Sequence, residues 1–154
     1  MTAMRRLALY VLLFALASAY AAAKDETVEQ LKAHFDDAHL RLEDRAVLGM
    51  RIAQRQLLAA DTLYREGNST QAMAAVEDIA TYSEKARDAS TQTGKHLKNV
   101  EIDVRKMAEK LRDIKRTLAF DDQAPVDQAI RRLEDVRTTL LQAMFAQEKK
   151  KEKK

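Results

Sequence analysis

Apolar residues recur every three or four positions along most of this chain, which is the spacing that places them on one face of an α-helix. The first such run lies between about residues 25 and 65, and a second lies between about 70 and 119. In the second run the steps of three and four alternate from Val76 to Leu118 without a break, which indicates a coiled-coil seam. A third, shorter run follows over about 125–147. The pattern therefore predicts an all-α fold of three helices.

Two short segments separate the predicted helices. Gly67 suits the left-handed residue that follows a helix, and Asn68 with Gln71 suits a capping box that starts the next one. Such a short connection forces the first two helices into an antiparallel hairpin of long helices. Further along the chain the seam is interrupted, and Pro125 suits the first turn of the third helix.

The predicted helix lengths determine how far the helices overlap. The third helix covers only the second half of the second helix, where both form a three-helix bundle with the start of the first. The rest of the hairpin, about residues 42–93, then projects as a two-helix arm. Its seam buries little area around Ser83 and Ser90, and Gly94 weakens the helix there, so this stretch should bend. A second copy or another protein is expected to cover the arm by contacting Leu48, Ile52, Leu57 and Leu58.

The first 23 residues have the composition of a helical signal peptide. Two arginines precede an uncharged apolar stretch, and the small residues after it allow cleavage before Ala22 or before Lys24. The alternative is an uncleaved inner-membrane anchor over residues 7–23, which is short because a spanning helix needs about 20 apolar residues. The sequence therefore predicts a periplasmic or secreted protein that meets a membrane only if this segment is retained.

Charge and composition limit the classes of function. Residues 1–23 hold two of the 27 basic residues and none of the 24 acidic ones, and the tail 148–154 holds five lysines and two glutamates. The remaining domain, residues 24–147, therefore carries 20 basic and 22 acidic residues, which is unsuited to binding nucleic acid. Since there is no cysteine, disulfides and thiolate metal sites are excluded, and stability has to come from helix packing.

No catalytic, cofactor or phosphate-binding motif occurs in the chain, which favours a protein without enzymatic activity or cofactor. His39 and Glu43 are four residues apart, a spacing that would let two helical side chains share a metal ion. An ordinary solvated helix surface is the competing interpretation. The charged tail is expected to be disordered or a frayed helix end. Its lysines offer contacts to anionic surfaces, with a solubilising role as the alternative; they are Lys149, Lys150, Lys151, Lys153 and Lys154.

These features predict an exported, non-enzymatic helical interaction or structural protein. It would self-associate or bind a protein partner through the two-helix arm. A periplasmic holdase or stress protein that uses the same surface transiently is the first alternative. A metal-binding helical bundle centred on His39 and Glu43 is the second.

Overall fold

A computed structural model describes residues 26–153, which are helical almost throughout and contain no strand. The all-α prediction is therefore confirmed for this part of the chain. The predicted signal segment and the alternative anchor, residues 1–23 and 7–23, lie outside the described residues. The helices are α2 (Val28–Phe35), α3 (Leu42–Arg65), α4 (Ser69–Thr93), α5 (Leu97–Thr117) and α6 (Phe120–Glu152).

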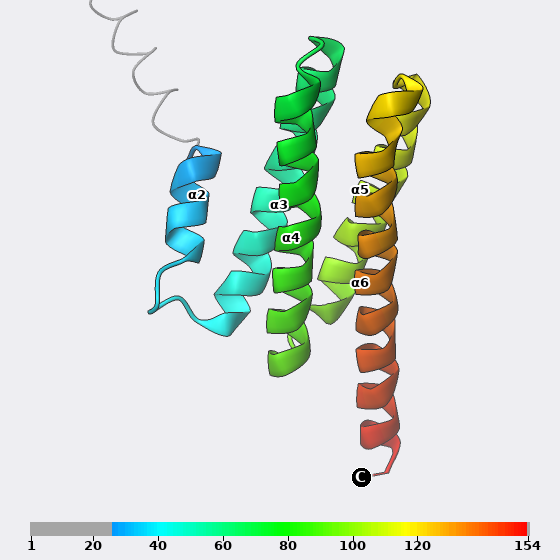
Figure 1. Cartoon of the computed structure of the whole chain (residues 1–154). Coiled ribbons are helices and arrows are strands. Elements are labelled where there is room, and N and C mark those ends of the chain that lie inside the picture. Colours follow the sequence, from blue (N-terminus) through cyan, green and yellow to red (C-terminus); the bar gives the residue numbers. More distant parts are fainter. Residues whose placement is uncertain (1–25, 154) are drawn as a thin grey trace, which may run out of the picture.

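The four longer helices run alternately up and down, and the short α2 lies on the outer side of α3 (Figure 1). Helices α3 and α4 form one hairpin, and α5 and α6 form a second. The hairpins pack together mainly where α6 lies along α4, while α5 also contacts α3 and α4. The described part of the chain therefore contains no projecting two-helix arm, because the second hairpin lies beside the first.

The prediction of one continuous helix over residues 25–65 is wrong at residues 36–41, where the chain turns back between α2 and α3. The Leu40 amide donates to the Asp37 carbonyl at 3.1 Å, and the His39 amide donates to Asp37 Oδ1 at 2.9 Å. A short polar side chain that bonds nearby backbone competes with the helix in this way. The turn places the buried Leu31 and Phe35 against the hairpin of α3 and α4.

The second predicted helix, residues 70–119, is wrong at Gly94, where α4 ends and the chain reverses into α5. Gly94 has a φ of 68° and donates its amide to the Ser90 carbonyl at 2.8 Å. His96 has a φ of 60°, an uncommon value for a residue with a side chain. The apolar spacing continues across the break because α4 and α5 each bury one face in the same core. The prediction of one uninterrupted coiled-coil seam from Val76 to Leu118 is therefore also wrong.

The other predicted boundaries differ in smaller ways. Gly67 has a φ of 78°, as predicted, but Asn68 caps α4 without a side-chain hydrogen bond, so the predicted capping box does not form. The third helix was predicted over 125–147, whereas α6 begins at Phe120 and contains Pro125. Since proline lacks an amide proton, it is tolerated near a helix start, where few intrahelical bonds are lost. The charged tail continues α6 as far as Glu152.

Small side chains set the spacing of α3 and α4. Ala46, Ala53 and Ala60 of α3 are fully buried, as are Ala72 and Ala86 of α4. Gly49 lies in the same row, and a Cβ built on it would be 3.0 Å from the Tyr82 carbonyl oxygen. The two backbones therefore approach closely at this level. Larger side chains fill the rest of the core, and Leu31, Ile52, Ile79, Leu111, Leu133 and Leu140 are fully buried.

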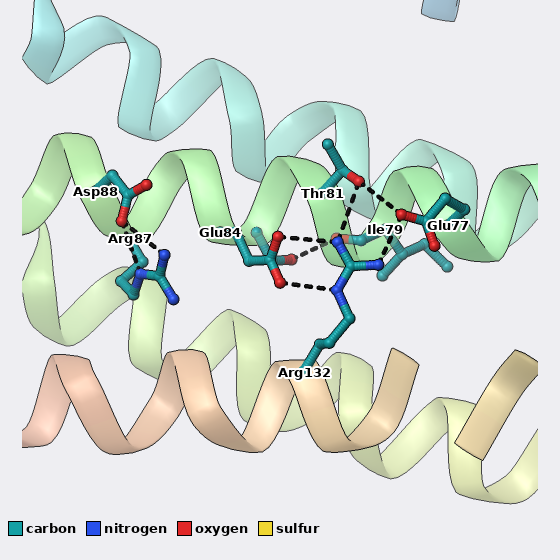
Figure 2. A network of polar contacts seen from close by, with 8 residues as sticks. Glu77, Ile79, Thr81, Glu84, Arg87, Asp88 and Arg132 are labelled. Atoms are coloured by element: carbon teal, nitrogen blue, oxygen red, sulfur yellow. Dashed lines mark hydrogen bonds and ion pairs between the residues drawn. The ribbon is translucent and has the colours of Figure 1, made fainter. Parts of the chain in front are cut away.

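Arg132 of α6 connects the two hairpins by polar contacts to α4 (Figure 2). It donates from Nε and Nη2 to the two carboxylate oxygens of Glu84, at 2.8 and 2.9 Å. It also donates to Glu77 at 2.7 Å and to Thr81 at 3.3 Å. The hydrogen bond from Arg132 lowers the pKa of Glu84 and raises the pKa of Arg132 itself. The carboxylate and the guanidinium are thus both held in their charged forms.

Candidate functional site

The four predicted contact residues on α3 have different environments. Leu48 and Ile52 are 6% and 0% exposed, so the prediction that they contact a partner is wrong for the folded chain. They are buried because α2 turns back and the second hairpin lies beside the first. Leu57 is partly buried against the core. Leu58 is 66% exposed and is the one of the four that is open to solvent.

Leu58 belongs to a row of exposed side chains along the outer face of α3, here called the α3 stripe: Val47, Arg51, Gln54 and Leu58. The residues are spaced four, three and four apart, so they share one side of the helix. Val47 is 46% exposed, so its apolar side chain is open to solvent, as is that of Leu58. The stripe therefore has an apolar side chain at each end and polar ones between.

Two hollows lie on either side of the N-terminal part of this stripe. One has a volume of about 250 Å³ and lies between α3 and the start of α5, where its lining includes Val47, Arg51, Gln54, His96 and Asp103. The other, of about 450 Å³, lies between α3 and α2 and is lined by Glu26, His34, Leu40, Asp44, Val47, Leu48 and Arg51. Both share Val47 and Arg51, so the two hollows border the same segment of α3.

The groups around these hollows carry both signs of charge. Arg51 lies 3.8 Å from the carboxylate of Glu26, with both side chains more than half exposed. Asp44 accepts hydrogen bonds from Arg41 at 2.8 and 3.3 Å. These bonds are the main reason that the pKa of Asp44 is lowered, with smaller contributions from His96 and His34. The hollow surface thus offers ionic contacts at its edge and apolar contacts at Val47.

The predicted metal pair is separated by the turn before α3. His39 lies in the turn over residues 36–41, whereas Glu43 lies in the first turn of α3, so the four-residue helical spacing does not apply. Within residues 26–153, no three His, Asp or Glu side chains are grouped in a way that could hold a metal ion.

A third hollow, of about 380 Å³, lies where the α4–α5 turn meets α6, and its lining includes His96 and Lys151.

The lysines of the tail extend the exposed end of α6. Lys149, Lys150 and Lys151 lie in its last turn, and Lys153 follows it. All four are exposed, whereas Lys154 lies outside the described residues. No helix between residues 26 and 153 combines the length and the apolar character needed to cross a membrane.

Three further groups with a shifted pKa, Tyr64, Tyr82 and Arg137, lie at contacts within the fold. Burial raises the pKa of Tyr64 and of Tyr82, and the pKa of Arg137 is raised by its hydrogen bond to Glu101. This pair joins α6 to α5 at 2.7 Å. The α3 stripe, with a hollow on each side, is therefore the surface best suited to a binding function.

Comparison of the chain with protein-family models, with curated proteins and with solved structures finds no match.

Proposed function

We propose that this chain is an exported, non-enzymatic helical protein that binds a protein partner along the α3 stripe. The observation that carries the proposal is the combination of exposed Val47 and Leu58 on one helix face with a hollow on each side of Val47. Exposed apolar side chains that line concave surface are typical of protein contacts. The partner segment that fits best is an amphipathic helix, which presents apolar side chains in a row.

The spacing of the stripe supports a helical partner. Val47 and Leu58 are separated by three helical turns, or about 16 Å along α3 at the usual rise per residue. A partner helix lying along α3 would place apolar residues opposite both ends. Between them, Arg51 and Gln54 offer polar contacts that fix the register. Because Arg51 lies beside Glu26, an acidic partner residue would compete with Glu26 for the guanidinium.

A loss of affinity in charged variants of the stripe tests the proposal. The partner is first isolated and identified from the native host, and its dissociation constant is then measured with purified proteins. The double variant Val47→Asp with Leu58→Asp should weaken binding by at least about a hundredfold, since each buried apolar side chain contributes about 1.5–3 kcal/mol. Phe145→Asp is the matched control, because Phe145 is 59% exposed on α6, away from the stripe. Unchanged affinity in the double variant would contradict the proposal.

Export, the other part of the proposal, rests on residues 1–23. The full chain is expressed in the native host, and the protein that accumulates outside the cytoplasm is sequenced from its N-terminus. We expect the mature protein to begin at Ala22 or at Lys24. A protein that begins at Met1 and stays with the membrane fraction would support the anchor instead.

A holdase is the second candidate, favoured by the mixture of polar and apolar side chains in open hollows. In this case the chain would suppress the aggregation of several denatured clients, and the Val47→Asp and Leu58→Asp double variant would suppress it less. A chain that slows aggregation of no client is not a holdase. In that case the affinity measurement above still tests whether the chain binds one specific partner.

A further inference from the structure

Helix α2 is attached to the rest of the protein by a small set of side chains. Leu31 and Phe35 are 1% and 5% exposed, and the Phe35 ring meets the Tyr82 ring edge-on with 5.2 Å between centroids. Lys32 Nζ lies 2.5 Å from Asp78 Oδ2 of α4, and Lys85 Nζ of α4 lies 5.3 Å from the centre of the Phe35 ring. An eight-residue helix is not stable by itself in water, so α2 depends on this docking site.

The segment between α2 and α3, residues 36–41, is compatible with two conformations. It contains neither glycine nor proline, and the helical spacing of apolar residues continues through it from Phe35 to Ala38 and Leu42. In the structure it forms a turn stabilised by three hydrogen bonds that Asp37 accepts, from the Leu40 and His39 amides and from Arg45 Nη2. The same residues therefore have the pattern of a helix and the conformation of a turn.

We propose that α2 exchanges between two copies of this chain, with residues 36–41 as the hinge. In the exchanged dimer, residues 28–65 of each copy form one continuous helix, and α2 docks on α3 and α4 of the other copy. Every contact made by Leu31, Lys32 and Phe35 is then reproduced by identical residues, so the exchange preserves the docking energy. The occupant of this site is thus a second copy.

The geometry of the closed chain is consistent with a symmetric exchange. Helix α2 runs opposite to α3, as Figure 1 shows. If α2 keeps this direction on the other copy, the two continuous helices run antiparallel and are related by a two-fold axis near the hinges. Opening breaks the hydrogen bonds that Asp37 accepts in the turn and forms helical hydrogen bonds over residues 36–41. Protein concentration then decides the balance between closed monomer and exchanged dimer. The exchange uses neither Val47 nor Leu58, so it goes beyond the proposed function and does not depend on it.

Cross-linking between isotopically distinct copies tests the exchange directly. Equal amounts of ¹⁴N- and ¹⁵N-labelled protein, each purified after expression of the full chain, are unfolded together, refolded at high concentration and treated with a carbodiimide. This reagent joins the Lys32 amine to the Asp78 carboxylate without a spacer. In the dimer fraction we expect about half of the Lys32–Asp78 cross-linked peptides to combine both labels, the statistical share for exchanged pairs. Only unmixed cross-links in that fraction, or the absence of any dimer, would overturn the proposal.

Two substitutions at the hinge should move the equilibrium between closed monomer and exchanged dimer in opposite directions. Ala38 occupies the second position of the turn from Asp37 to Leu40, where proline is favoured. Proline inside the continuous helix disfavours each open chain by on the order of a hundredfold, so Ala38→Pro should raise the dimer dissociation constant about ten-thousandfold. Asp37→Ala removes the side-chain hydrogen bond of the turn and should favour each open chain by about fivefold.

The dimer fraction of these variants is measured by light scattering during size-exclusion chromatography. Circular dichroism establishes that each variant is folded, and the cross-link experiment is repeated on any variant that forms a dimer. A dimer fraction in Ala38→Pro equal to that of the unmodified chain would overturn the proposal, because it would show association without a continuous helix. A decrease in dimer on Asp37→Ala would overturn it as well.

Discussion

Replacing Gly49 by alanine should destabilise the fold, although alanine is the better helix former. Gly49 lies inside α3, and a Cβ there would be 3.0 Å from the Tyr82 carbonyl oxygen. It would also be 3.3 Å from both Ala86 Cβ and Phe35 Cε2, whereas carbon atoms in optimal contact are about 3.5–4.0 Å apart. The added methyl group therefore meets α2 and α4 at once.

The expected magnitude follows from two opposing contributions. Alanine in place of glycine in a helix interior favours folding by about 1 kcal/mol. Forcing an extra carbon into a packed core costs about 1–3 kcal/mol. Here the cost should lie near the upper end, because the nearest atom is a main-chain oxygen that moves only with α4. We therefore expect Gly49→Ala to lower the free energy of unfolding by about 1–2 kcal/mol.

Urea unfolding followed by far-ultraviolet circular dichroism measures this loss. Ala74→Gly is the control, since Ala74 is exposed in α4 and reports the helix preference of alanine alone. Ala74→Gly should lower the free energy of unfolding by about 1 kcal/mol. If Gly49→Ala is as stable as the unmodified chain, or more stable, then α3 and α4 do not approach as closely as the structure shows and the reasoning is refuted.

Other substitutions test the polar contacts, the exposed stripe and the turn after α4. A double-mutant cycle with Arg132→Met and Glu84→Gln should give a coupling energy of about 1 kcal/mol in urea unfolding; additive effects would contradict the pairing. Since the pKa of Glu84 is below its unfolded value of 4.5, its contribution is complete above that pH and disappears as the pH falls through the folded-state pKa. Glu84→Gln should remove this part of the acid sensitivity in unfolding measured against pH. Leu58→Asp should change the free energy of unfolding by less than about 0.5 kcal/mol, because Leu58 is 66% exposed; a larger loss would show that it is packed. Gly94→Ala should lower the melting temperature and cost at least about 1 kcal/mol. The residue has a φ of 68°, and its new Cβ would lie 2.5 Å from Gln147 Nε2; an unchanged melting temperature would contradict the left-handed conformation.

The helical character of the chain could be predicted from sequence because apolar spacing reports which face of a segment is buried. It does not report the direction in which the chain continues. The spacing from Phe35 through Ala38 to Leu42 is the same whether α2 continues into α3 or folds back on it. The fold-back depends on Asp37 as a local acceptor and on Tyr82 as a distant packing partner. The distant contact cannot be recognised in a local pattern.

Gly94 illustrates a second limit of the sequence. The small residues around it indicated a weak point, but a glycine inside a helix and a glycine that ends one look alike locally. Its conformation is decided by α5, whose large apolar side chains bury more area by packing on the existing core than by extending away from it. The same tertiary effect explains the binding surface. Val47 is off the apolar pattern of α3, and the hollows beside it exist only because α2 and α5 lie on either side.

The division into two sequence-local hairpins has a consequence for how the chain acquires its structure during synthesis. The α3–α4 hairpin closes within about fifty residues, and contacts that are near in sequence form quickly because little chain entropy is lost. This hairpin can therefore form before α5 has been made, and the face that receives α2 is complete at that stage. For a short time α2 has its docking site while the second hairpin is still missing. Exchange of α2 would therefore require only the first hairpin of each copy.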